Sequence, residues 1–170
     1  ELDTLSKEFL ALRRFRHPNI VAVYDLGYTE EQVAYFTMDF VDGETLNSYI
    51  CHPNREWLQS LCREIMLALA AVHGQGMLHA DLKPANILID TNEGHPRARL
   101  ADFGLTATIQ EFSTEHIRGT VPYLAPERIL RQPPNIHSDL YALGVLLYHL
   151  FTGELPFGEE PAQTVLKRHL

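Results

Sequence analysis

One short polar segment constrains the structure of this chain more than any other part of its sequence. Residues 79–86 read His-Ala-Asp-Leu-Lys-Pro-Ala-Asn, and the triplet Asp-Phe-Gly begins at residue 102, sixteen residues after Asn86. The segment puts a carboxylate, a lysine and an amide on one short loop. The triplet adds a second carboxylate at the start of a loop that contains a glycine. Any fold proposed for this chain must accommodate these groups in this order and at this spacing.

These groups suit the transfer of a phosphoryl group from a magnesium-bound nucleotide to a hydroxyl. Such a transfer needs in-line positioning and neutralised charge more than covalent chemistry from the protein. We predict that Asp81 orients the acceptor hydroxyl and that Lys83 faces the transferring phosphate. Asn86 and Asp102 would hold Mg²⁺, which prefers hard oxygen ligands. Each residue alone has an ordinary alternative: the two aspartates could be turn residues, Lys83 a solvated lysine and Asn86 a strand-edge amide. The order and spacing of the whole set favour the catalytic interpretation.

Several further segments give the chain a resemblance to eukaryotic-type protein kinases. The similar segments are 9–21, ending His-Pro-Asn-Ile-Val, like a kinase αC helix and its following turn; 38–43, Met-Asp-Phe-Val-Asp-Gly, like a hinge; 125–127, Ala-Pro-Glu; and 138–145, like the start of αF. Residues 82–86 and 119–123 resemble the serine/threonine branch, in a style closest to the bacterial eukaryotic-like kinases.

The resemblance implies an α+β, bilobal, kinase-like fold, mainly the helical C-lobe together with the αC helix and the last N-lobe strands. Residues 1–40 would be a remnant of the N-lobe and residues 41–170 the C-lobe through αG. A kinase carries a Gly-rich loop and a β3 lysine before αC, and the chain contains neither motif. Glu8 stands where the αC glutamate would meet that lysine. We therefore expect an incomplete catalytic domain that is inactive or weakly active by itself.

The resemblance also implies ATP and Mg²⁺ as cofactors, with Met38 as gatekeeper. The Asp39 carbonyl and the Val41 N–H would bind adenine, and Leu88 would pack under its ring. The nucleotide-binding residues implied in this way are Met38, Asp39, Val41, Lys83, Ala85, Asn86, Leu88 and Asp102, with Asn86 and Asp102 as metal ligands. Thr120 would contact Asp81 and Lys83 and help to place a protein substrate with a Ser or Thr acceptor.

Two further roles follow from the resemblance. His79 would be structural and not an acid or base, in an internal stack with Leu12, Val23 and Phe103 that is tied to Asp139. Glu127 would anchor the activation segment through an arginine of a later helix, which the chain lacks. A buried carboxylate without its partner is costly, so we expect Glu127 to weaken the isolated segment.

Ala80 departs from the pattern of regulated protein kinases, which have an arginine that pairs with an activation-loop phosphate. We expect phosphorylation of that loop not to switch the enzyme through this contact, although Thr106, Thr108, Ser113 and Thr114 are available. Loss of activity on replacing all four by alanine would refute this.

A small-molecule phosphotransferase of kinase-like fold and a pseudokinase scaffold remain alternatives. The intact segment before Ala-Pro-Glu disfavours the first, and the complete visible catalytic set disfavours the second.

Composition excludes several other classes of protein. The net charge of −8 without a basic stripe argues against nucleic-acid binding. Two separated cysteines argue against a disulfide scaffold and favour a cytoplasmic location. The longest apolar run, residues 140–151, has twelve residues, whereas a membrane-spanning helix needs about 20. We expect no membrane contact from this segment, and the oligomeric state stays open.

The periodicity of apolar residues predicts the main elements. We expect helices over 3–16, 54–72 and 138–152, a short helix near 45 and a last helix from 161; strands are expected over 20–26, 33–40, 87–89 and 98–100. Asn54 is the predicted N-cap of the second helix, and Gly153 is the predicted end of the third. The predicted buried face of the second helix consists of Trp57, Leu58, Leu61, Ile65, Ala68, Leu69 and Val72.

Overall fold

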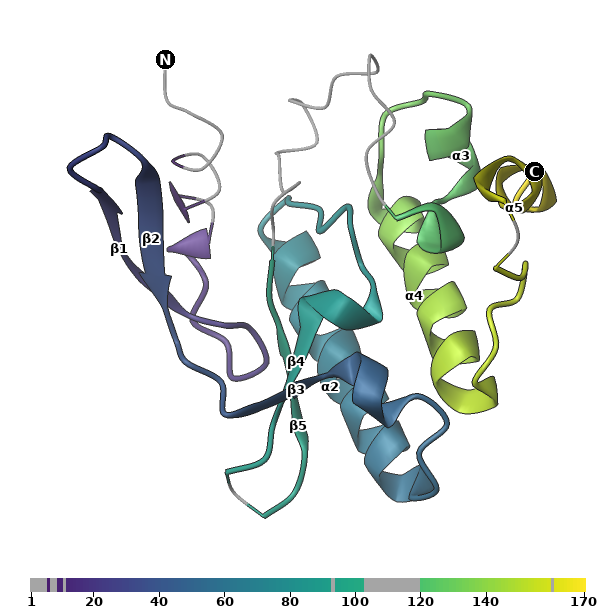
Figure 1. The fold of residues 1–170 in the computed structure, drawn as a ribbon, viewed down its shortest axis with the longest axis horizontal. Coiled ribbons are helices and arrows are strands. Elements are labelled where there is room, and N and C mark those ends of the chain that lie inside the picture. The colour runs from purple at the N-terminus through teal and green to yellow at the C-terminus, as the bar shows by residue number, and fades with distance from the viewer. Residues whose placement is uncertain (1–5, 7–8, 11, 93, 103–119, 160) are drawn as a thin grey trace.

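The computed structural model describes residues 6, 9–10, 12–92, 94–102, 120–159 and 161–170. It is an α+β structure, as the sequence predicted, in which two small antiparallel sheets lie beside a group of helices (Figure 1). In chain order the elements are β1 (Val23–Tyr28), β2 (Ala34–Met38), β3 (Gly43–Thr45), the 3₁₀ helix η1 (Leu46–Tyr49), α2 (Arg55–Gly74), η2 (Pro84–Asn86), β4 (Ile87–Asp90), β5 (Arg97–Leu100), η3 (Val121–Tyr123), α3 (Pro126–Ile129), α4 (Ile136–Thr152) and α5 (Ala162–Arg168).

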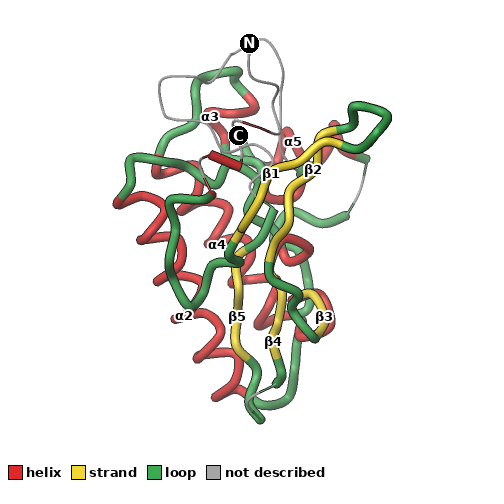
Figure 2. The backbone as a smooth tube through the Cα atoms, turned by 90° about the vertical axis from the view of Figure 1, so that its left-hand side faces the viewer, coloured by secondary structure: helices red, strands yellow, loops and turns green. Residues whose placement is uncertain are grey.

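The two sheets lie one above the other in Figure 2, with the β1–β2 hairpin above the β3–β4–β5 sheet. The predicted strand over 20–26 begins later than expected, at Val23. The residues before it pair with β5 instead, because the N–H of Val21 donates to the Leu100 carbonyl at 3.0 Å. Leu100 in turn donates to the Asn19 carbonyl at 2.8 Å. The segment before β1 therefore fastens the upper sheet to the lower one.

Gly43 allows the chain to enter the lower sheet a few residues after the end of β2 at Met38. Gly43 begins β3 opposite Asp90 of β4. A Cβ atom at Gly43 would lie 1.8 Å from the carbonyl oxygen of Ile89, far inside van der Waals contact, so only glycine fits this approach. The predicted hinge, residues 38–43, is thereby held between β2 and β4.

Helix α2 begins where the sequence predicted. The Asn54 side chain accepts hydrogen bonds from the N–H groups of Glu56 and Trp57 at 3.1 and 3.2 Å. Six of the seven residues predicted to be buried are buried, and Cys62 joins them. Trp57 is the error: its side chain is 37% exposed and its ring stacks on His52 with centroids 5.3 Å apart. It lies in the first turn of α2, where a local aromatic partner replaces the core.

Helix α4 starts two residues earlier than the predicted Ser138. Asn135 caps it, and its side chain and that of Ser138 form a reciprocal capping box. The helix ends at Gly153, whose φ of 80° is left-handed, as predicted. Helix α5 follows Pro161, also as predicted. Together α2, α4 and the lower sheet enclose one core cluster around Leu61, Ile87 and Leu146.

Two expectations fall largely outside the described residues. The predicted helix over 3–16 is only partly described. Its described helical residues are 6, 9, 10 and 12, which is consistent with the prediction. The segment 103–119, which includes Phe103 and the four hydroxyl residues of the expected activation loop, also lies outside the described part. Among the residues that the structure describes, no helix has both the length and the apolar character needed to cross a membrane.

Candidate functional site

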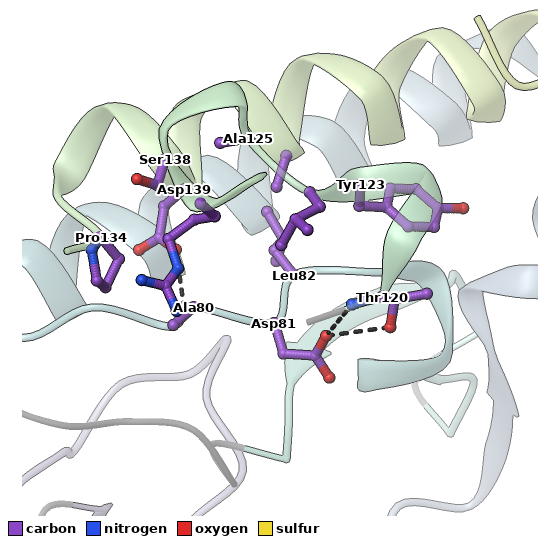
Figure 3. Close-up of a pocket in the computed structure, with 12 residues that line it drawn as sticks. Ala80, Asp81, Leu82, Thr120, Tyr123, Ala125, Pro134, Ser138 and Asp139 are labelled. Atoms are coloured by element: carbon purple, nitrogen blue, oxygen red, sulfur yellow. Dashed lines mark hydrogen bonds between the residues drawn. The ribbon is translucent and has the colours of Figure 1, made fainter. Parts of the chain in front are cut away.

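The carboxylate of Asp81 lies at the centre of the candidate site. Lys83 Nζ donates to its Oδ2 at 2.6 Å. Thr120 donates to its Oδ1 from both its N–H and its hydroxyl, each at 3.1 Å, and Figure 3 shows this pair of bonds. The contact of Thr120 with Asp81 was predicted, whereas a hydrogen bond between Thr120 and Lys83 is absent among these described side chains. Asp81 thus has a fixed orientation and remains partly accessible to solvent.

Asn86 connects Asp81 to the rest of the loop. Its Nδ2 donates to the Asp81 carbonyl at 2.9 Å and to Asp81 Oδ2 at 3.2 Å. The Asn86 side chain is buried in the short helix η2, which Pro84 starts. With its amide nitrogen committed to Asp81, the amide oxygen of Asn86 is the atom that could bind a metal ion.

A cavity of about 330 Å³ opens between the two sheets, beside this loop. It is lined by Leu12, Val21, Val23, Phe36, Met38, Ala85, Leu88, Ala101 and Asp102. Four of the predicted nucleotide-binding residues, Met38, Ala85, Leu88 and Asp102, are therefore brought together here. Its walls are mostly apolar with one carboxylate, and its volume lies at the low end of the range for small-molecule pockets.

Asp102 and Asn86 meet the requirements of a magnesium site in the nature of their donor atoms. Both offer hard oxygen atoms, and Asp102 lines the cavity with a left-handed backbone of φ 53°. Among the described residues, no group of three or more His, Cys, Asp or Glu side chains could hold a metal ion. Mg²⁺ is usually held by one or two carboxylates together with water and substrate phosphates.

The predicted hinge residues Asp39 and Val41 are not among the residues that line this cavity. Val41 is buried against Val21 and Ala101, with Leu88 packed on the same group. The Asp39 N–H donates to the Ala22 carbonyl at 2.9 Å. Within the described part of the chain, neither the Asp39 carbonyl nor the Val41 N–H has a hydrogen-bond partner. These are the two backbone groups predicted to bind adenine.

The sequence did not predict how the Asp39 side chain is held. Arg99 Nη1 donates to its Oδ2 at 3.1 Å, and the Tyr24 hydroxyl donates to its Oδ1. The hydrogen bond to Asp39 raises the pKa of Tyr24. The contact joins β1, the segment after β2 and β5. The only sequence signal was an arginine between apolar residues, and that pattern is also typical of a solvated strand face.

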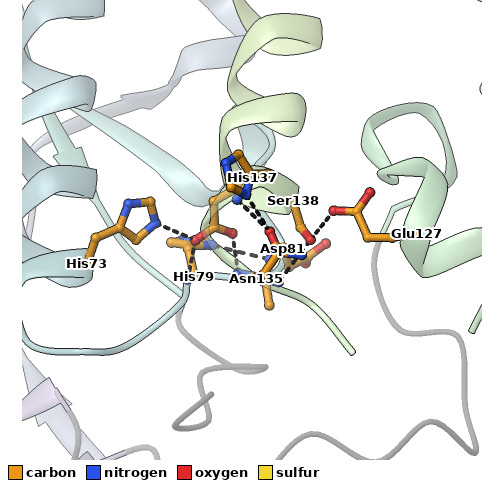
Figure 4. A network of polar contacts seen from close by, with 9 residues as sticks. His73, His79, Asp81, Glu127, Asn135, His137 and Ser138 are labelled. Atoms are coloured by element: carbon orange, nitrogen blue, oxygen red, sulfur yellow. Dashed lines mark hydrogen bonds and ion pairs between the residues drawn. The ribbon is translucent and has the colours of Figure 1, made fainter. Parts of the chain in front are cut away.

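Asp139 of α4 anchors the loop at His79 and Ala80; the sequence had predicted that the stack containing His79 is tied to Asp139. Asp139 is 2% exposed, and its carboxylate accepts from the N–H of His79 at 2.9 Å and of Ala80 at 2.8 Å. His73 at the end of α2 also bonds to it, with Nε2 2.8 Å from Oδ2 (Figure 4). The sequence had indicated no role for His73. Ala80 itself has a φ of 63°, so this anchor holds a strained backbone in place.

His79 fits the predicted structural role. Its side chain is fully buried, and burial lowers its pKa even though the carboxylates of Asp139, Asp81 and Asp102 favour the charged form. A neutral imidazole accepts the Asp81 N–H at its Nδ1, at 3.3 Å. The other proposed members of its stack include Phe103, which is outside the described residues.

The expectation that Glu127 would be buried without a partner is wrong. The carboxylate is only half-buried and accepts a hydrogen bond from the Ser138 hydroxyl at the start of α4 (Figure 4). Ser138, the N3 residue of the α4 capping box, therefore also fixes the Ala-Pro-Glu segment. The sequence contained the signal, because a serine at the N3 position of a capped helix is oriented toward the preceding turn.

Comparison with known proteins agrees with this geometry. The protein kinase domain family matches residues 1–170. The chain is 35% identical to the probable serine/threonine-protein kinase PknB of Lactococcus lactis, 37% to the serine/threonine-protein kinase PrkC of Bacillus subtilis and 39% to the serine/threonine-protein kinase PkaA of Streptomyces coelicolor. These alignments cover 96%, 94% and 96% of the chain, and 26%, 26% and 31% of the respective relatives.

The chain belongs to the protein kinase domain family, and its bacterial relatives confirm the resemblance inferred from the motifs. It spans about a quarter of the length of the first two relatives. Members of the family generally use ATP and Mg²⁺.

Proposed function

We propose that the protein that carries this chain is a serine/threonine protein kinase that transfers the γ-phosphoryl group of ATP to protein hydroxyls. One observation carries the proposal: the Asp81 carboxylate is oriented by Lys83, Asn86 and Thr120 beside a cavity suited to a nucleotide. Four donor groups from these three residues hold one carboxylate, so its orientation is fixed before an acceptor hydroxyl arrives. The partner is a protein with a Ser or Thr acceptor, and we place the reaction in the cytoplasm.

The cavity between the sheets would take the adenine of ATP. Val23 and Met38 form one wall and Leu88 the opposite one, so that an aromatic ring could lie between apolar surfaces. The Asp39 carbonyl would accept from the exocyclic amine, and the Val41 N–H would donate to a ring nitrogen. An acceptor and a donor at fixed spacing on one extended segment give this edge its specificity.

The polar end of the cavity would hold the phosphates. Asn86 and Asp102 would hold Mg²⁺, which neutralises charge on the phosphate oxygens. Asp81 accepts the proton of the incoming hydroxyl and aligns its oxygen, and Lys83, 2.6 Å from Asp81, screens the charge that develops on the transferred group. The two hydrogen bonds from Thr120 keep Asp81 in this orientation.

We also propose the division of the chain. Residues 1–40 belong to the N-lobe and 41–170 to the C-lobe, with α5 as αG. Support comes from the position of the hinge, since residues 38–43 connect the β1–β2 sheet to the β3–β4–β5 sheet. The cavity between those sheets is then the cleft between the lobes.

The decisive experiment replaces Asp81 in the protein that carries this chain. Asp81→Asn keeps the size of the side chain but removes the charge that accepts the proton, so phosphoryl transfer to a Ser/Thr peptide should fall by roughly 10³-fold or more. ATP binding, measured by titration, should change little. Asp25→Asn is the control, because Asp25 is exposed on β1, and it should leave the rate unchanged.

Three results would overturn the proposal in different ways. Undiminished transfer by Asp81→Asn would show that Asp81 does not accept the proton of the acceptor hydroxyl. ATP binding without transfer to any acceptor would make the protein a scaffold of kinase fold. Transfer to an aminoglycoside but not to any peptide would make it a small-molecule phosphotransferase.

A further inference from the structure

Four polar side chains form a cluster behind the hinge, and none of them has been given a role in the chemistry. Arg99 Nη1 lies 3.1 Å from Asp39 Oδ2, and Arg99 Nη2 lies 3.2 Å from Asp90 Oδ2. The hydroxyl of Tyr24 donates to the other oxygen of Asp39. One guanidinium therefore bridges two carboxylates that lie 51 residues apart in the sequence, between positions 39 and 90.

This hinge cluster joins the two sheets. Tyr24 belongs to β1 and Asp39 follows β2, whereas Asp90 ends β4 and Arg99 lies in β5. Arg99 is the cross-strand partner of Leu88, which lines the cavity. The cluster is thus a side-chain connection between the two sheets that border the nucleotide cavity, in addition to the backbone hydrogen bonds of residues 19–21.

The cluster could simply be a surface ion pair with little consequence, since exposed pairs contribute little to stability. Two features argue for more. The guanidinium contacts both carboxylates through separate nitrogens, which fixes its plane, and Asp90 is only 14% exposed, against 27% for Asp39 and Arg99. In addition, Asp39 carries the backbone carbonyl proposed to bind adenine, so fixing its side chain also restricts that peptide unit.

We propose that Arg99 is a positioning residue for ATP, which holds Asp39 so that the hinge backbone is aligned with the adenine. The inference rests on the proposed kinase function and extends it to a residue outside the cleft. Arg99 acts through Asp39 and need not touch the nucleotide. Its effect should therefore appear in ATP binding and not in the transfer step.

The test is a kinetic comparison in the protein that carries this chain. Arg99→Met keeps the aliphatic stem but removes the charge, and should raise KM for ATP about threefold to fivefold, with kcat and KM for the peptide changed less than about twofold. Arg99→Lys, which presents one point charge in place of a fork, should give an intermediate KM. In an Asp39→Asn background, Arg99→Met should add almost nothing, because the two residues act as one unit.

Arg63→Met is the matched control, since it removes the same charge from an exposed position on α2, and its KM for ATP should equal that of the unsubstituted protein. An unchanged KM in Arg99→Met, or additive effects with Asp39→Asn, would overturn the inference. Equal losses in kcat and in both KM values would show a general structural role instead. If the unsubstituted protein neither binds ATP nor transfers phosphate, the kinase assignment itself fails, which is a different result.

Discussion

The catalytic loop and the hinge lie on two sides of the same cavity but are held in opposite ways. The loop is fixed from inside, by a carboxylate of α4 that is 2% exposed and that accepts two backbone N–H groups. The hinge is fixed from outside, by an arginine and a carboxylate that are each 27% exposed. A buried anchor is strong because no water competes for its donors, whereas an exposed one is weakened by water and by salt. Chemistry should therefore depend on the fold itself, and nucleotide affinity on a weaker, adjustable contact.

Removing the charge of Asp139, the buried anchor of the loop, should have the largest effect on stability and activity. Asp139→Asn leaves one acceptor oxygen but turns an amide N–H₂ toward groups that are themselves donors. We expect the free energy of unfolding to fall by about 3 kcal/mol, with a large loss of phosphoryl transfer because residues 79–86 lose their support. Chemical denaturation and a peptide assay would measure both.

Asp25→Asn serves as control here too, because exposed substitutions away from special contacts change stability by less than about 0.5 kcal/mol. A loss in Asp139→Asn as small as that of the control would contradict the claim that the loop depends on a buried anchor.

The two regions should also differ in their response to pH. Burial lowers the pKa of His79 below its ordinary value of 6.5, so the unfolded chain binds the proton more readily than the folded one. Its contribution to stability is complete above the ordinary pKa and is lost as the pH falls from there through the folded pKa. Between pH 7.5 and 5.5 we expect stability to fall, at up to about 1 kcal/mol per pH unit below the ordinary value.

His79→Phe removes this titrating group and should flatten the pH dependence of unfolding, even if the variant is less stable at every pH. The hinge cluster contains no histidine, so the effect of Arg99→Met on KM for ATP should be the same at both pH values. An identical slope in His79→Phe and in the unsubstituted protein would show that His79 does not titrate on unfolding.

Local signals in the sequence predicted much of this molecule. Asn54 and Gly153 marked helix ends because capping depends on neighbouring residues, and the order of Asp81, Lys83, Asn86 and Asp102 indicated one site. What the sequence did not predict depends on contacts between distant elements. Arg99 meets Asp39 across 60 residues, and no local pattern distinguishes such an arginine from a solvated one.

The errors have the same origin. Trp57 is apolar and at helical spacing, yet the first turn of α2 projects it past the core onto His52. Residues 20–21 have a strand-like sequence, but they pair with β5 instead of continuing β1. In each case a tertiary contact overrode a preference that was correct locally.

The smallest expected effect concerns backbone strain within the catalytic loop. Ala80 has a left-handed φ of 63°, which disfavours any residue with a Cβ atom and is held here by the bond from its N–H to Asp139 at 2.8 Å. Ala80→Gly removes the steric cost but loosens the unfolded chain, so we expect a net gain of about 0.5 kcal/mol in unfolding free energy. Gly76→Ala is the converse control, because Gly76 also has a left-handed φ of 68° and open space around its Cα, and it should lose stability. If Ala80→Gly were clearly destabilising, the side-chain methyl group would be packing against the loop, and the anchor would hold a favourable conformation and not a strained one.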